Sequence, residues 1–228
     1  MSPIASLYAS WALTGFWPIT AKLAGEDAEP ILFGFLHLAL GLAVLLPWLL
    51  ARGRWRRLAE PGLVVPFLVL GGLGSGITTA MLQIGVGMTT AANAAIVCQV
   101  EVVYSAVLAA VILGERISPR QAAASTLVLA GTVVILGKDL GTPHWAGDLL
   151  ILATPWMFQV SHIFSKRLPE DIEPVTIVGG RLLYGMLVLG AILLLRCALG
   201  PPRWSPTPRF WPILAFHGIL LNSIGMTL

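Results

Sequence analysis

Eight long apolar runs, separated by short polar connections, dominate this sequence. A helix needs about 20 apolar residues to cross the hydrocarbon core of a bilayer. Lipid offers no partners to free backbone groups, so continuous runs of this length have to be helices. The sequence therefore predicts an all-α polytopic membrane protein, with apolar segments at roughly 4–23, 30–51, 63–87, 90–113, 121–137, 147–167, 174–197 and 209–228.

The charge content agrees with a chain that lies in lipid. Charged residues make up 11% of the sequence, whereas a typical soluble domain has about 25%. The basic residues gather between the apolar runs, and Arg52, Arg54, Arg56 and Arg57 form the densest group. Groups of this kind orient membrane helices. The net charge of +3 is therefore explained by basic residues that orient the helices in the lipid bilayer, which is the expected partner. No nucleic-acid partner is expected.

The same basic residues predict an orientation. With the N-terminus in the cytoplasm, the four-arginine group and the later pairs Arg116/Arg120 and Lys166/Arg167 all face inward. The connection that contains Arg196, Arg203 and Arg209 departs from this trend. The first apolar run is expected to be a retained helix and not a cleavable leader. We expect a multi-pass protein of the plasma or inner membrane.

Two stretches of the sequence repeat each other in their polar residues. Residues 22–38 read KLAGEDAEPILFGFLHL and residues 166–182 read KRLPEDIEPVTIVGGRL. The matching spacing predicts one five-helix repeat over residues 1–140 and a second, incomplete one with three helices over residues 147–228. An odd number of helices inverts the second copy across the membrane. Inverted repeats are common in secondary transporters, whose substrates bind between the halves. Two further helices are expected after Leu228.

The segment from 89 to 136 reads TTAANAAIVCQVEVVYSAVLAAVILGERISPRQAAASTLVLAGTVVIL. Its small residues, its Gly114-Glu115-Arg116 turn and its later Pro119 and Gly131 resemble the EamA-type drug/metabolite transporter family. The resemblance implies a ten-helix bundle, of which about eight helices are present, that moves small metabolites by alternating access, usually outward. Two positions depart from the family pattern: His37 replaces the usual arginine, and Val102 replaces a common proline.

Glu101 is the most informative candidate for function, because it falls near the centre of its apolar run. Ionisable groups at this depth mark ion or substrate paths by default, and desolvation favours the neutral acid. A proton is therefore a candidate coupling ion. Asn93, Glu101 and Tyr104 share one helical stripe that is able to face a cavity. The alternative is a structural carboxylate that bonds to a neighbouring helix.

Other polar and aromatic residues within the apolar runs extend this candidate set. His37 and Arg181 occupy matching positions in the two repeats and are candidates to bind an anionic group or Glu101. Trp17 and Trp156 lie at mid-depth, where an interfacial aromatic belt does not explain them. The predicted substrate-binding set is Trp17, His37, Asn93, Glu101, Tyr104, Trp156, Arg181 and Asn222.

Two other classes of function were weighed against a transporter. A membrane enzyme, such as a lipid-modifying transferase, needs a cluster of acids, bases or metal ligands, but the four histidines lie on separate segments. No catalytic residue, metal site or cofactor is therefore predicted. A non-transporting membrane subunit or sensor is the other alternative, and the polar stripe around Glu101 argues against it. Substrate, transport direction and oligomeric state do not follow from the sequence.

Overall fold

The computed structural model describes residues 12, 14–114, 116–139, 141–165, 168–169 and 171–224. These residues form helices joined by short connections, and one isolated bridge joins Ala28 to Trp204. Five helical segments are long and apolar enough to span a membrane: Pro30–Ala51, Pro61–Met88, Ala91–Ile112, Pro119–Asp139 and Pro174–Ala198. The prediction of an all-α polytopic fold is confirmed.

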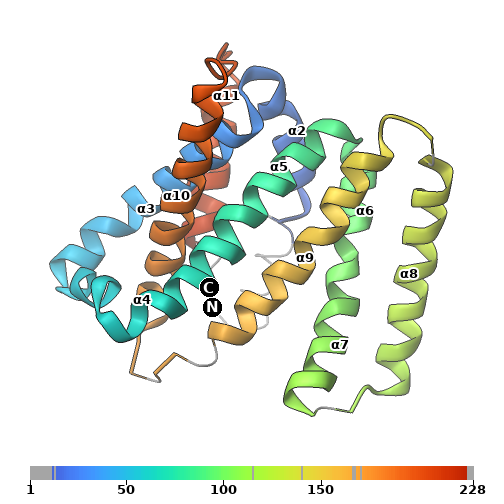
Figure 1. Cartoon of the computed structure of the whole chain (residues 1–228), viewed down its shortest axis with the longest axis horizontal. Helices are drawn as coiled ribbons and strands as arrows, with labels where there is room; N and C mark the ends of the chain where they lie inside the picture. Colours follow the sequence, from blue (N-terminus) through green and yellow to red (C-terminus); the bar gives the residue numbers. More distant parts are fainter. Residues whose placement is uncertain are drawn as a thin grey trace.

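The helices follow the predicted apolar runs in order (Figure 1). A short 3-10 turn, η1 (Arg54–Ala59), holds most of the arginine group between the second and third runs. The runs correspond to α2 (Trp17–Asp27), α3 (Pro30–Ala51), the continuous α4–η2–α5 (Pro61–Phe67, Leu68–Ile77, Thr78–Met88), α6–η3–α7 (Ala91–Val97, Cys98–Val100, Glu101–Leu113), α8 (Pro119–Asp139), α9 (Trp145–Ser165), α10 (Pro174–Ala198) and α11–η4 (Phe210–Ala215, Phe216–Ile224).

Proline marks the start of four of these helices, at Pro30, Pro61, Pro119 and Pro174. Its fixed φ suits the first helical position, where the missing N–H has no intrahelical partner. The predicted fifth run, 121–137, is shorter than the helix that forms there. Helix α8 has 21 residues and continues through Lys138 to the buried Asp139. The prediction stopped at the first charge, although charged residues are accommodated at helix ends.

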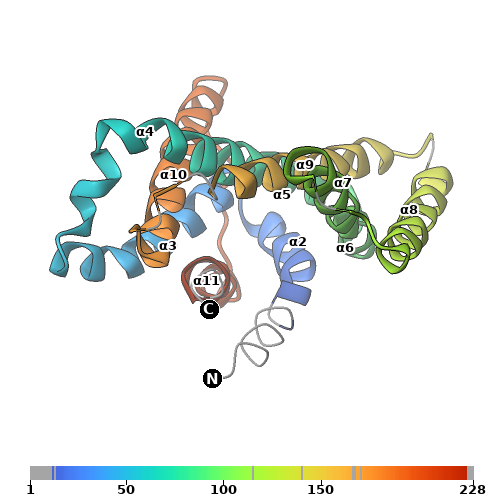
Figure 2. The same ribbon diagram turned by 90° about the horizontal axis from the view of Figure 1, so that it is seen from below.

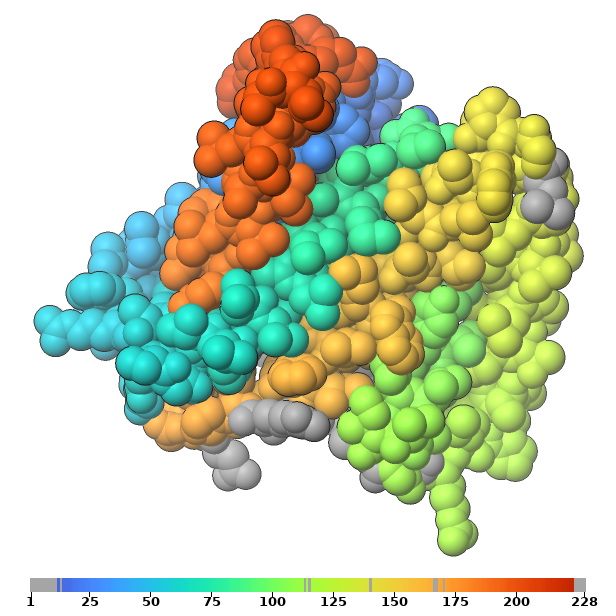
Figure 3. All heavy atoms as spheres, in the orientation of Figure 1, coloured from blue at the N-terminus to red at the C-terminus, as the bar shows by residue number. Residues whose placement is uncertain are grey.

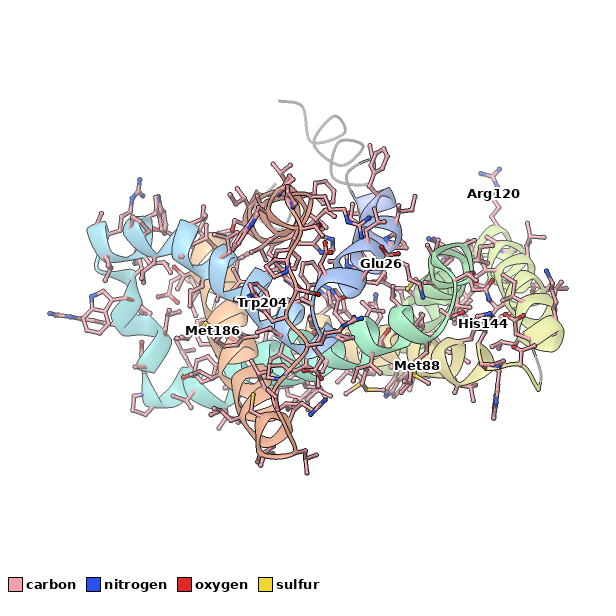
Figure 4. The ribbon with its side chains drawn as sticks, turned by 90° about the horizontal axis from the view of Figure 1, so that it is seen from above. Glu26, Met88, Arg120, His144, Met186 and Trp204 are labelled. Atoms are coloured by element: carbon pink, nitrogen blue, oxygen red, sulfur yellow. The ribbon has the colours of Figure 1, made fainter. Side chains whose placement is uncertain are left out.

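The Gly114-Glu115-Arg116 turn ends α7. Gly114 has φ +68°, a left-handed conformation that other residues adopt at a cost, so glycine is suited to this helix end. Arg120, the second residue of α8, extends away from the helices (Figure 4). Glu115 lies outside the described residues.

The helices form two parts that are seen side by side in Figures 1 and 2. In one part, α10 packs across η2 and α3, while α3 also packs against η4. In the other, α6, α7 and α8 form a hairpin that joins the first part mainly through α9. Helix α8 lies at the edge of the molecule (Figure 3) and exposes apolar side chains such as Leu127 and Val134, as expected for a lipid-facing helix.

Glycine allows α10 and η2 to approach each other closely. A Cβ atom built on Gly71 would lie 2.6 Å from the Arg181 backbone carbonyl oxygen, and one built on Gly185 would lie 3.1 Å from the carbonyl oxygen of Gly71. Neither contact leaves room for a side chain. Small residues at crossings of this kind hold membrane helices together through close packing. The crossing fixes the positions of Arg181 and of Ser75, which both belong to the candidate site.

The two ends of α3 carry ion pairs with exchanged partners. Before α3, Glu29 accepts a hydrogen bond from Arg196 at 3.0 Å; beyond its other end, Arg54 donates to Glu173. Glu29 and Glu173 occupy matching positions in the predicted repeats, and each pairs with an arginine of the other repeat. A two-fold relation produces such an exchange, and we propose it as the arrangement of segments 1–140 and 147–228.

A second exchanged pair accompanies the first. Arg209 bonds Asp27 at 3.4 Å, and Arg57 bonds Asp171, the counterpart of Asp27, at 2.6 Å. The charge of Asp171, followed by that of Glu60, raises the pKa of Arg57. Both arginines lie outside the membrane-spanning segments. Ion pairs thus join the connections on both sides of the bundle, in addition to the covalent links of the chain.

The α10–η2 crossing predicts a strong effect for one small substitution. Gly71→Ala places a methyl group against backbone that cannot yield locally, and overpacking of this kind costs about 1–3 kcal/mol. Gly131→Ala on α8 meets no atom within 4 Å and serves as the matched control. Unfolding of the purified proteins in mixed detergent micelles measures both changes. Equal stability of the two variants would show that the crossing is not closely packed.

Candidate functional site

A cavity of about 330 Å³ lies inside the bundle, between α2, α3, the η2–α5 segment, α9 and η4. Trp17, Leu38, Leu82 and Phe158 give it apolar walls. The polar groups on its lining include His37, Thr78, Gln83, Glu101, His217 and Asn222. Ligand pockets in proteins share this composition, with apolar walls and a few polar groups that orient the ligand.

Glu101 lies on the wall between this cavity and a second one of about 810 Å³. The second cavity runs between α2, α7, α8 and α9, and both cavities are also lined by Thr14, Trp17 and Cys98. The carboxylate is partly buried, and its Oε1 accepts a hydrogen bond of 2.7 Å from Gln159 Nε2 on α9. Glu101 thus borders two cavities, as expected for a carboxylate on a substrate or ion path. It is also hydrogen-bonded to a neighbouring helix, as expected for a structural carboxylate.

The polar stripe of α6 and α7 faces α9. Asn93 bonds Asp148, Tyr104 donates to the Leu152 backbone carbonyl at 3.2 Å, and Glu101 accepts from Gln159. The predicted stripe therefore exists, but Asn93 and Tyr104 are absent from the lining of the central cavity. Helix packing explains the difference, because α9 lies directly against this face.

Asn93 belongs to a separate polar cluster at the end of the bundle. Its amide donates to Asp139 and, at 3.4 Å, to Asp148, and Thr89 donates to Asp148 at 2.5 Å. Lys22 is nearby and donates to the backbone carbonyls of Val86, Gly87 and Thr89. This cluster joins α2, α5, α6, α8 and α9. The sequence contained one signal for it: two acidic residues at facing ends of neighbouring apolar runs.

His37 and Asn222, two residues of the predicted substrate-binding set, come from opposite halves of the chain and contact each other. Asn222 Nδ2 lies 2.8 Å from His37 Nδ1, and Nε2 of His37 is buried without a partner among the described residues. The ring of His217 lies 5.6 Å from that of His37, and its Nε2 is 2.8 Å from the Thr20 hydroxyl. These contacts connect α3, η4 and α2 along one side of the cavity.

Arg181 lies behind the cavity wall and is absent from its lining. Its Nε donates to the Ser75 hydroxyl at 2.8 Å, and its guanidinium carbon lies 4.4 Å from the centre of the Phe158 ring. Ser75 and Phe158 both line the cavity. The arginine is thus one side chain away from the space that His37, its counterpart in the first repeat, borders directly.

The two tryptophans of the predicted set differ in position. Trp17 lines both cavities. Trp156 is 47% exposed and packs edge-on against Tyr104, so it lies outside the cavities. Trp156 lies in the middle of α9, and its ring is directed outward. Lys166 lies outside the described residues.

The third apolar run contributes cavity residues that sequence reasoning missed. Ser75, Thr78, Thr79 and Gln83 all line the central cavity. These polar residues within an apolar span were the signal available in the sequence. Within the described part of the chain, no group of three or more His, Cys, Asp or Glu residues is placed to hold a metal ion.

Known proteins resemble this chain in sequence and in fold. A probable amino-acid metabolite efflux pump of Escherichia coli (strain K12) is 30% identical over 149 residues. The match covers 59% of this chain and 49% of that protein, so the chain matches about half the length of its relative. A solved crystal structure superposes with a TM-score of 0.67 over 99% of this chain and 79% of its own length. Its sequence identity of 21% supports a shared fold alone.

The EamA-like transporter family matches residues 1–137, which include α2 to α7 and nearly all of α8. This region contains the Gly114 turn and the cavity residues His37 and Glu101. The match covers more than half of the chain and agrees with the helical fold. The chain belongs to the EamA-like transporter family.

Proposed function

We propose that this protein moves small organic solutes, amino-acid-like compounds among them, across the plasma or inner membrane by alternating access. The observation that carries the proposal is a cavity with apolar walls and several polar groups inside an apolar bundle, bordered by a carboxylate that also faces a second cavity. Polar groups are expensive in lipid, so their gathering around a space indicates a path for a polar solute. Transport, rather than chemical conversion, is the activity proposed.

Export is the direction we propose, with the N-terminus in the cytoplasm. The name of the Escherichia coli relative, an efflux pump for amino-acid metabolites, supports the direction and the solute class. The four arginines at the α3 end support the orientation, since basic connections stay on the cytoplasmic side. The cavity of about 330 Å³ is at the small end of ligand pockets, which suits a compound of amino-acid size.

We further propose that a proton on Glu101 couples to solute movement. Glu101 borders both cavities, so it is reachable from either space. Three groups surround it: the Gln159 amide that bonds it, the Cys98 thiol that shares both linings, and the charge of Arg181, which attracts it. Burial favours the neutral form of the carboxylate, whereas the Gln159 amide and the Arg181 charge stabilise its charged form, so these opposing effects keep both forms accessible.

Glu101→Gln tests the coupling. The amide retains the size of the side chain and a partner for Gln159 but carries no titratable proton. We expect proteoliposomes with the variant to lose accumulation driven by an imposed pH gradient and to retain exchange of solute between the two sides. Accumulation at the wild-type level would contradict the proposal. Glu26→Gln, at an exposed carboxylate paired with Arg209 outside the cavity, is the matched control.

The proposed path predicts that water-soluble reagents reach Cys98. Cys98 lines both cavities, whereas the other cysteine, Cys197, is exposed and is removed by Cys197→Ser. A cationic methanethiosulfonate should modify Cys98 at least about tenfold faster than a cysteine introduced by Leu127→Cys into a background lacking both native cysteines. Leu127 is 76% exposed on α8, where lipid excludes charged reagents. Equal rates at the two sites would contradict a hydrated path.

A further inference from the structure

Arg181 is a buried cation with unused hydrogen-bonding capacity. Its side chain is 6% exposed, yet none of the ion pairs among the described residues includes it. Ser75 occupies its Nε, while its Nη2 is buried and has no partner in the described structure. A guanidinium carries five N–H donors and no acceptor, so this side chain is short of acceptors.

An arginine in this state is expensive inside a membrane protein. Burial removes the charge from water, and attraction to a partner compensates for that loss only with good hydrogen-bond geometry. The charge of Glu101 attracts Arg181, but Glu101 accepts a hydrogen bond from Gln159 and forms no ion pair with the guanidinium in the described structure. The fold therefore buries the Arg181 guanidinium without a hydrogen-bonded anionic partner among the described residues. An acceptor from outside the chain would complete the site.

The geometry leaves one edge of the guanidinium available. The guanidinium carbon lies over the Phe158 ring, 4.4 Å from its centre, and Ser75 bonds the Nε side. Stacking uses the face of the group and leaves its in-plane donors free. The terminal nitrogens are the pair that binds both oxygens of a carboxylate in parallel. Ser75 and Phe158 themselves line the central cavity, so Arg181 lies directly behind its wall.

We propose that Arg181 binds the carboxylate of the transported solute and makes the cavity selective for compounds that carry this group. The inference rests on the proposed transport function and names the chemical class of its substrate. Ser75 is a positioning residue, since it holds Nε and so directs the free edge. Glu101 lies elsewhere on the cavity wall, so the carboxylate of the solute is bound by Arg181 and not placed against Glu101.

The rates at which an anionic and a cationic thiol reagent modify Cys98 test the binding site, and this test does not require the solute to be known. In the Cys197→Ser background, Cys98 is modified with an anionic sulfonatoethyl and with a cationic trimethylammonioethyl methanethiosulfonate. Arg181→Gln should lower the ratio of the anionic to the cationic rate by about tenfold, as expected for loss of one charged contact. Arg181→Lys, which retains the charge, should preserve the ratio. An unchanged ratio in Arg181→Gln would overturn the assignment.

Three compounds of similar shape test the solute class in proteoliposomes: L-leucine, L-leucinamide, which lacks the carboxylate, and 4-methylpentanoate, which lacks the amine. We expect the wild-type protein to move the two carboxylates in preference to the amide. Arg181→Gln should reduce transport of both carboxylates about tenfold or more and leave the amide unchanged. A parallel loss for all three compounds, with a lower melting temperature, would assign Arg181 a structural role instead.

The outcomes separate this inference from the function on which it rests. Wild-type transport that favours the amide overturns carboxylate recognition and leaves the transport proposal standing. Transport of none of the three compounds by the wild-type protein overturns both. Where Arg181→Gln fails to fold, Ser75→Ala replaces it, because that change removes only the hydroxyl that holds Nε. It should shift the reagent ratio in the same direction by a smaller factor, and no shift would count against the proposal.

Discussion

Hydrocarbon offers no hydrogen bonds, and this constraint governs the whole structure. Each polar group inside the bundle must find its partner within the protein or beside a cavity. Lys22 meets this demand by reaching three backbone carbonyls at the end of α5, and Tyr104 by donating to a carbonyl of α9. Two of the buried polar groups without a hydrogen-bond partner in the described structure, His37 Nε2 and Arg181 Nη2, lie at or directly behind the central cavity. The others belong to Glu29, Arg54, Ser125 and Thr176.

Close backbone packing makes the cavity possible. Without side chains at Gly71 and Gly185, α10 and η2 approach until backbone contacts backbone. This crossing places Arg181 beside Ser75 although the two residues come from different predicted repeats. The exchanged ion pairs at the two ends of α3 connect the same halves again through charge. Packing and charge therefore join the halves around the space between them.

The sequence predicted the elements of the fold and part of the site. Run length and proline punctuation identified the helices, because lipid permits no other continuous element. Of the predicted set, Glu101, Trp17, His37 and Asn222 line the central cavity. The outward ring of Trp156 depends on helix rotation, to which depth within a run gives no access. Their roles in binding remain predictions.

Two segments of the structure, η2 and η4, are wound as π-helices. Such a segment holds more residues per turn than an α-helix. Rewinding one turn to α geometry would displace the downstream residues by about one position, which corresponds to roughly 100° of rotation and 1.5 Å of rise. Ser75 and Asn222 lie within these segments, next to Arg181 and His37. The winding of two helices therefore sets the register in which the cavity presents its polar groups.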